Sequence, residues 1–178
     1  LDTAYRSFVG MHPIPIVHGM TIGEYAQMIN GQKWLKDSLE CDLTVIPMLG
    51  YNKQMSYDLP VKPSPNLPNA QAVNLYPSLC LFEGTNVSVG RGTDLPFQHY
   101  GAPYLESDYS FVPESGAGAK YPKQEGEKCY GQDLRQLPKL SQLDLSFLID
   151  AYKACPEKED FFNAFFDKLA GGNTLRIS

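Results

Sequence analysis

Apolar residues recur at helical spacing soon after the N-terminal segment. Thr21 stands three residues before Glu24, which is the spacing of a capping box at a helix start. The apolar residues that follow share one helical face. They are Ile22, Tyr25, Ala26 and Ile29. This pattern predicts a helix from about Ile22 to Asn30.

Two further helices are predicted towards the C-terminal end. Ser141 is placed to cap a helix from Gln142 to about Ala154, which Pro156 ends. Apolar and aromatic residues then recur at helical spacing from Glu159 to Ala170, and Gly171 follows as a C-terminal cap. The aromatic residues of these segments are expected in the core.

Short apolar runs between the helices predict strands. Leu43 to Met48 is β-branched and apolar, and Leu79 to Phe82 suggests a buried strand. Asn69 is expected to cap a short helix through Leu75, which Pro77 ends. Together these elements indicate an α+β fold, with a mixed sheet and a few helices.

Residues 106–140 have no clear hydrophobic period. Structureless loops of this length are uncommon in compact domains, and they are usually functional or conceal short strands. Within this region, Lys123 to Lys128 reads as a solvated charge run. We therefore expect a single domain over residues 1–178, with a loop-rich insert at about 106–140 and a helical end at 141–172.

Composition narrows the classes of function. Hydrophobic residues make up 43% of the 178 residues and charged residues 20%, which fits a soluble globular protein. The net charge of −5 argues against nucleic acid as a partner. No apolar run approaches the roughly 18 residues of a membrane-spanning helix.

Cysteine and histidine are spread singly, without the spacing of a zinc or redox site. We therefore predict no structural metal and no cofactor. Buried, unpaired thiols are favoured over disulfides, which stay open if the protein is exported. The four cysteines are Cys41, Cys80, Cys129 and Cys155.

The segment Glu83–Thr93 carries the densest chemistry in the chain. It holds one carboxylate, one amide, one guanidinium, three hydroxyls and three glycines. Small residues let backbone N–H groups approach a ligand, and polar side chains can converge on it. The alternative is a glycine-rich turn whose polar residues bond to their own backbone, and the sequence leaves both interpretations open.

Each candidate side chain can likewise be interpreted as binding a ligand or as serving only the structure. Burial of Glu83 would suit acid/base chemistry or a contact to a hydroxyl, whereas a bond to local backbone would be structural. Arg91 offers a planar fork for a carboxylate or phosphate, or forms a structural ion pair. His18, Asn66 and Asn86 either bind a ligand or serve local turns. Serine-hydrolase and P-loop motifs do not fit the serines and glycines of this chain.

Five separated motifs resemble one known family. They are Pro15–Thr21 (Pro-Ile-Val-His-Gly-Met-Thr), Pro63–Pro68 (Pro-Ser-Pro-Asn-Leu-Pro), Phe82–Thr93, Gly101–Pro103 and Phe166–Gly171 (Phe-Asp-Lys-Leu-Ala-Gly). In this order they resemble the exo-β-N-acetylmuramidases of the NamZ/YbbC type, and the resemblance covers nearly the whole chain.

The resemblance implies a bacterial glycoside hydrolase of cell-wall recycling, exported to the periplasm or cell exterior. Such enzymes release N-acetylmuramic acid from the non-reducing ends of peptidoglycan fragments. It further implies that this chain is the second subdomain, forming one wall of a cleft and inactive alone. Its partner would be a Rossmann-like N-terminal half that carries the leading catalytic glutamate.

Matching motif positions implies roles for five residues. Glu83 becomes a candidate catalytic carboxylate, or a binder of sugar hydroxyls. The expected substrate-binding residues are His18, Asn66, Asn86 and Arg91. Many members carry an acidic residue where this chain has Val89, which puts activity or specificity in question.

Two other classes of function stay open. A non-catalytic peptidoglycan-binding module would use aromatic residues such as Tyr51, Tyr57 or Tyr104 as a sugar platform. A phosphorylated ligand or nucleotide would instead bind at Gly90–Thr93.

Overall fold

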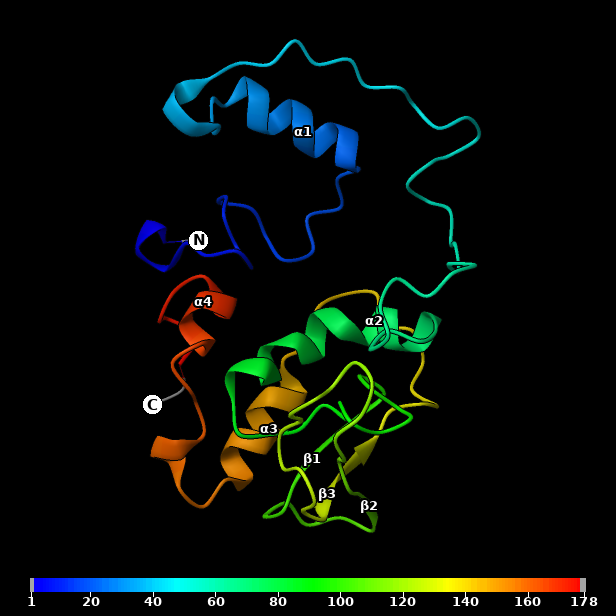
Figure 1. Ribbon diagram of the computed structural model, residues 1–178, viewed down its shortest axis with the longest axis vertical. Helices are drawn as coiled ribbons and strands as arrows, with labels where there is room; N and C mark the ends of the chain where they lie inside the picture. Colours follow the sequence, from blue (N-terminus) through cyan, green and yellow to red (C-terminus); the bar gives the residue numbers. More distant parts are fainter. Residues whose placement is uncertain (1, 177–178) are drawn as a thin grey trace. The chain divides into compact units, whose positions relative to one another are not determined.

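The computed structural model describes residues 2–176 of the chain, which form two compact units. The smaller unit is His12–Tyr57. The larger unit joins the segment up to Met11 with the chain from Asp58 onward. Figure 1 shows their helices and strands.

The smaller unit is built around helix α1 (Ile22–Gly31). The predicted capping box is present: the Glu24 N–H donates to Thr21 Oγ1 at 3.1 Å, and the Thr21 N–H donates to Glu24 Oε2 at 2.8 Å. Near the end of the helix, the Asn30 side chain bonds both the N–H and the carbonyl of Cys41. The prediction of this helix is confirmed to within one residue.

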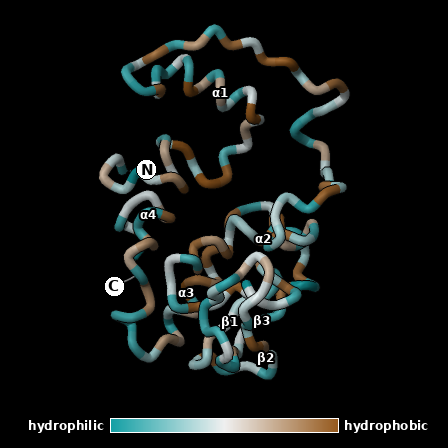
Figure 2. The backbone as a smooth tube through the Cα atoms, in the orientation of Figure 1, coloured by the Kyte–Doolittle hydropathy of each residue, from teal (hydrophilic) through white to brown (hydrophobic). Residues whose placement is uncertain are grey.

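The predicted strand at 43–48 is wrong. This segment is irregular, and within the described residues it has no strand partner. Ile46 and Leu49 are almost fully exposed, and Figure 2 shows hydrophobic segments alternating with hydrophilic ones between α1 and α2. A strand is defined by its pairing, so apolar and β-branched residues alone do not make one.

The larger unit contains a small antiparallel sheet. Its strands are β1 (His99–Ala102), β2 (Tyr109–Phe111) and β3 (Cys129–Asp133), in the order β1-β3-β2. Gly131 of the central strand lies opposite both Gly101 and Tyr109. Two of these strands fall inside residues 106–140, so the region without a clear period conceals short strands.

Helix α2 (Ala70–Leu79) leads directly to the candidate site. Asn69 caps it as predicted, because its Oδ1 accepts from the Ala72 N–H at 3.0 Å. Pro77 does not end this helix, which continues into a 3-10 turn at Cys80–Gly84. The buried strand predicted at Leu79–Phe82 is therefore wrong, since a short apolar run fits a buried helix equally well.

The C-terminal helices are shorter than predicted. Helix α3 (Ser146–Ala154) begins four residues late, where Asp144 rather than Ser141 accepts from the first N–H. The second predicted helix is split into a 3-10 turn at Lys158–Asp160 and helix α4 (Phe166–Ala170). Between them Asn163 donates its N–H to the Gly84 carbonyl, which interrupts the helix. Gly171 has a φ of 72° and ends α4 as expected.

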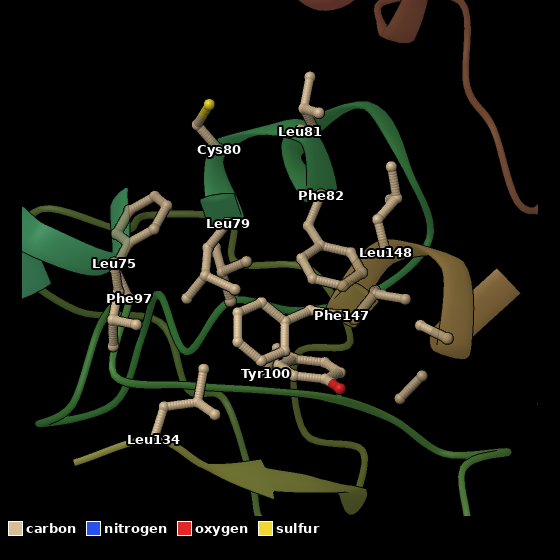
Figure 3. Packing of buried hydrophobic residues seen from close by; sticks show 14 of the residues in the cluster. Leu75, Leu79, Cys80, Leu81, Phe82, Phe97, Tyr100, Leu134, Phe147 and Leu148 are labelled. Atoms are coloured by element: carbon tan, nitrogen blue, oxygen red, sulfur yellow. The ribbon is translucent and has the colours of Figure 1, made fainter. Parts of the chain in front are cut away.

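The core of the larger unit lies between the sheet, α2 and α3 (Figure 3). Gly84 belongs to this packing, because an added Cβ would collide with the backbone of Phe166. The cysteines are free thiols, three of them buried, whereas Cys41 is exposed. None of the described helices is long and apolar enough to cross a membrane.

Candidate functional site

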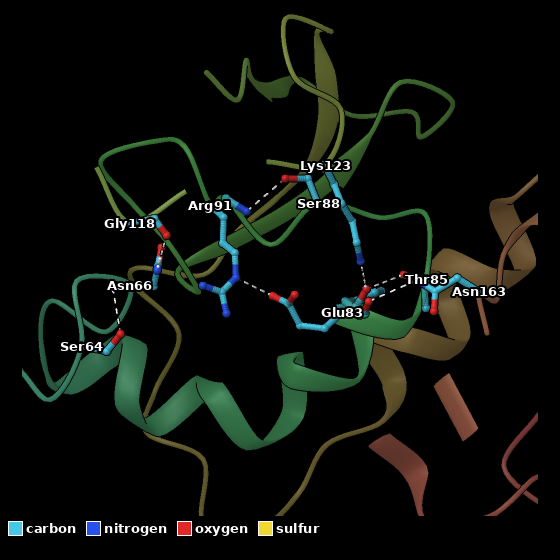
Figure 4. A network of polar contacts seen from close by, with 11 residues as sticks. Ser64, Asn66, Glu83, Thr85, Ser88, Arg91, Gly118, Lys123 and Asn163 are labelled. Carbon is cyan, nitrogen blue, oxygen red and sulfur yellow. Dashed lines mark hydrogen bonds and ion pairs between the residues drawn. The ribbon is translucent and has the colours of Figure 1, made fainter. Parts of the chain in front are cut away.

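Glu83 and Arg91 form an ion pair on the surface of the larger unit. The 3-10 turn after α2 presents Glu83, and the glycine-rich loop presents Arg91, whose Nε donates to Glu83 Oε1 at 2.7 Å (Figure 4). The side chains of Glu83 and Arg91 are 26% and 34% exposed, so both remain partly accessible to solvent. Within the described chain, the terminal guanidinium nitrogens of Arg91 have no hydrogen-bond partner.

Lys123 lies beside this pair, and its predicted solvation is wrong. Its Nζ donates to the carbonyl of Phe82 at 2.5 Å. Burial lowers the pKa of Lys123 to about 8, partly offset by attraction to Glu83. The run becomes exposed only from Glu125 onward. The sequence carried no signal for this, because a lysine in a charge run has the same appearance whether it is buried or not.

Two aromatic rings lie next to the ion pair, the buried ring of Phe97 and the partly exposed ring of Tyr76. The Arg91 guanidinium lies 5.0 Å from the ring centre of Phe97, and that ring packs on Tyr76 at 4.9 Å. Tyr76 remains partly exposed. We call Tyr76, Glu83, Arg91 and Lys123 the ion-pair patch.

The glycines of the loop serve packing more than ligand approach. A Cβ on Gly90 would overlap the His99 ring, and one on Gly92 would overlap Pro122 and the Glu114 carbonyl. The Thr93 hydroxyl donates to the Gly90 carbonyl at 2.7 Å. To this extent the loop bonds to its own backbone, as in the structural interpretation, and Arg91 is the side chain that it presents.

His99 supports the loop from below. Its ring is 1% exposed and stacks on Phe111 at 3.9 Å. Nε2 lies 3.1 Å from Thr93 Oγ1, and Nδ1 lies 2.7 Å from the Tyr109 hydroxyl. Burial lowers the pKa of His99 to about 4, so the ring is neutral at pH 7.

Asn86 is used within the protein. Its Oδ1 accepts from the Tyr104 hydroxyl at 2.7 Å, and its Nδ2 faces the Cys155 sulfur at 3.8 Å. Its backbone bonds Phe161 and the Gln124 side chain. The structure thus places Asn86 in a network that joins three segments, and none of these bonds is to Glu83 or Arg91.

Asn66 lies at a polar hollow of about 590 Å³ next to the loop. The hollow is lined by Asn66, Gly92, Thr93 and the 114–117 segment, among others. Asn66 Nδ2 donates to the Gly118 carbonyl at 2.9 Å. Its Oδ1 accepts no hydrogen bond from any residue that the structure describes.

His18 belongs to the smaller unit and is exposed. Its Nδ1 accepts from the Met20 N–H at 3.0 Å, so the neutral ring carries its proton on Nε2. His12, by contrast, is buried, stacked on Trp34 and bonded to Tyr25. Over residues 2–176, no group of three His, Cys, Asp or Glu side chains is placed to hold a metal ion.

Comparison with known proteins places the chain in a class of glycosidases. The model of the N-terminal domain of exo-β-N-acetylmuramidase NamZ matches residues 1–71, and that of its C-terminal domain matches residues 74–178. The chain therefore belongs to the NamZ exo-β-N-acetylmuramidase family, as the five motifs suggested.

Individual relatives agree with this assignment. The peptidoglycan β-N-acetylmuramidase NamZ of Bacillus subtilis (strain 168) is 36% identical over 99% of this chain and 47% of its own length. A crystal structure of a DUF1343 family protein from Bacteroides fragilis NCTC 9343 superimposes with a TM-score of 0.95 at 51% identity, over 99% of this chain and 51% of that one. A second such protein from the same organism, at 23% identity and a TM-score of 0.80, shares the fold over 52% of its length. The chain thus spans about half the length of these relatives.

Proposed function

We propose that this chain is part of a peptidoglycan exo-β-N-acetylmuramidase, and that the ion-pair patch forms one wall of its active-site cleft. The observation that carries the proposal is the open guanidinium of Arg91, held beside Glu83 and Lys123. Family membership supplies the substrate class, because the Bacillus subtilis relative is a peptidoglycan β-N-acetylmuramidase.

Arg91 suits the lactyl carboxylate of N-acetylmuramic acid. Its Nε is engaged by Glu83, while the two terminal nitrogens can donate in parallel to a second carboxylate. Lys123 adds positive charge next to this position. N-acetylglucosamine lacks the lactyl group, so the patch distinguishes the two sugars of peptidoglycan.

Of the two carboxyl groups that a glycosidase uses, Glu83 suits the nucleophile or base rather than the general acid. Glycosidases use two carboxyl groups, one to protonate the leaving oxygen and one as nucleophile or base. A carboxylate paired with a guanidinium accepts hydrogen bonds and has no proton to donate. We assign Glu83 to the nucleophile or base role, or to binding sugar hydroxyls, and assign the acid to a glutamate of the Rossmann-like half.

Of the other expected binding residues, Asn66 and His18 have a polar atom left free by the described residues to contact the sugar, whereas Asn86 does not. Asn66 Oδ1 is open at the polar hollow and can accept from the N–H of the acetamido group. His18 Nε2–H can donate to a sugar hydroxyl. Asn86 instead holds the shape of the wall through Tyr104 and Cys155. The protein would act in the bacterial envelope, where peptidoglycan lies.

Turnover of a chromogenic N-acetylmuramic acid glycoside by the full-length parent protein tests this function. We expect hydrolysis, with free N-acetylmuramic acid as the product. Binding of muramic acid fragments without any hydrolysis would contradict it and favour a non-catalytic peptidoglycan-binding module.

A further inference from the structure

A second hollow, of about 470 Å³, opens between β3, α3 and the segment after β1. Its lining includes Tyr100, Tyr104, Glu106, Gly131 and Asp150. It shares no lining residue with the hollow beside Asn66 and includes no member of the ion-pair patch. Its size is within the range of small-molecule sites.

Tyr100 gives this hollow an unused polar group. The side chain is 2% exposed, and its ring stacks on Phe82 at 4.9 Å and packs on Phe147 at 5.9 Å. No residue within 2–176 forms a hydrogen bond with its hydroxyl, whose oxygen keeps some access to solvent although the rest of the side chain is buried. A tyrosine hydroxyl in such a position usually has a partner. In Figure 3 the hydroxyl points away from Leu75 and Leu134. A ligand in the hollow would supply the missing partner.

The acidic residues that line this hollow favour a positively charged ligand. Asp150 and Glu106 are acidic, and the lining contains no lysine, arginine or histidine. The Tyr104 hydroxyl is already committed to Asn86. Leu105 and Ala151 add an apolar wall. The described residues offer no third His, Cys, Asp or Glu for a metal ion, so an organic cation fits better than a metal.

We propose that this hollow binds a primary ammonium group on a short aliphatic stem. The ammonium donates to the Tyr100 hydroxyl oxygen and to the Asp150 carboxylate, while the stem packs on Leu105 and Ala151. Burial and the nearby Asp150 raise the pKa of Tyr100, so its hydroxyl stays protonated and neutral beside the cation. A free small amine and a lysine-like side chain of a peptide share this chemistry. The site is independent of the proposed glycosidase function.

Titration of the chain followed by amide NMR tests the site. The probe is n-butylammonium chloride, and n-butanol is the control with the same stem and no charge. We expect saturable shifts at Gly131 and Ala151 with the amine and none with the alcohol. N-acetyl-lysine methylamide tests the peptide source, and tighter binding than n-butylammonium would assign the site to a peptide side chain. Equal responses to amine and alcohol, or no saturation with either amine, would overturn the proposal.

Two variants locate the binding. Tyr100→Phe keeps the ring packing and removes the hydroxyl, and Asp150→Asn removes an exposed charge with little effect on folding. Each should weaken amine binding on the order of tenfold, because each removes a hydrogen bond to a charged group. Tyr121→Phe, which removes a hydroxyl on the exposed surface, is the control and should bind normally. Unchanged affinity in Asp150→Asn, whether or not Tyr100→Phe folds, would overturn the proposal.

Discussion

Arg91 Nε donates to Glu83 Oε1 over 2.7 Å, and this bond joins the glycine-rich loop to the turn that follows α2. Glu83 occupies Nε, and the terminal nitrogens of Arg91 have no hydrogen-bond partner among the described residues. The pair is thus both a structural ion pair and a presented guanidinium. The two interpretations that the sequence left open for Arg91 are therefore compatible.

Replacing Arg91 by Lys should selectively weaken binding of muramic acid. The charge next to Glu83 is kept, but the fork that holds a carboxylate with two bonds is lost. We expect affinity for N-acetylmuramic acid to fall roughly 10- to 100-fold, with little change for N-acetylglucosamine. Calorimetric titration of the parent protein with both sugars measures this. Arg135→Lys, on an exposed pair with Asp133, is the control. Equal losses for the two sugars would remove Arg91 from carboxylate recognition.

Gly90→Ala should destabilise the larger unit. Gly90 has a φ of 76°, and a Cβ there would overlap the His99 ring, so strain and overpacking add. We expect a loss of about 2–5 kcal/mol in the free energy of unfolding, measured with urea. Gly50→Ala is the matched control, since Gly50 has a φ of 74° with open space around it. It should lose only about 1–2 kcal/mol. Similar losses in both would mean that His99 does not limit this position.

His99 should make the free energy of unfolding fall as the pH becomes acidic. Its pKa is about 4 in the folded chain and about 6.5 when unfolded, so the unfolded state binds more protons between these values. Its contribution is fully present above pH 6.5 and is lost as the pH falls towards 4, by up to about 3 kcal/mol. Urea unfolding of the chain from pH 7.5 to 4.5, compared with His99→Gln, measures the difference. An unchanged slope in His99→Gln would contradict the assignment.

Lys123 should titrate apart from the other lysines. Burial beside the Phe82 carbonyl lowers its pKa to about 8, whereas exposed lysines titrate near 10.4. Labelling the amines by reductive methylation and following their carbon shifts with pH measures this. Lys123→Arg identifies the signal by its loss from the spectrum. A Lys123 signal that titrates with the rest would place its ammonium in solvent.

The parts of the fold that depend on local chemistry could be predicted from the sequence. Thr21 with Glu24, and Asn69 with Ala72, form caps between residues a few positions apart, and Gly171 ends α4 where a glycine was expected. The strands could not be predicted in this way. The apolar segment 43–48 has no strand partner among the described residues, whereas the polar sequence of β3 is a strand because β1 and β2 flank it.

In the candidate site, too, the residues that stand close together in the sequence could be predicted, whereas those brought in by other contacts could not. Glu83 and Arg91 stand in one conspicuous motif, and the structure brings them together. Lys123 lies beside them through a bond to Phe82, 41 positions away, which no spacing in the sequence records. His99 contacts the loop through Thr93, only six positions away, but its burial there also depends on Phe111 of β2. Binding roles for His18, Asn66 and Asn86, and the single-domain organisation, stay predictions.

The most direct measurement is hydrolysis of a chromogenic N-acetylmuramic acid glycoside by the full-length parent protein carrying Glu83→Gln. The substitution keeps the size of the side chain and removes the charge that a nucleophile or base requires. We predict a fall in kcat of at least about a hundredfold. Glu125→Gln, at an exposed position in the charge run, should retain normal turnover. Near-normal activity in Glu83→Gln would contradict the assignment of Glu83 to the chemistry of the cleft.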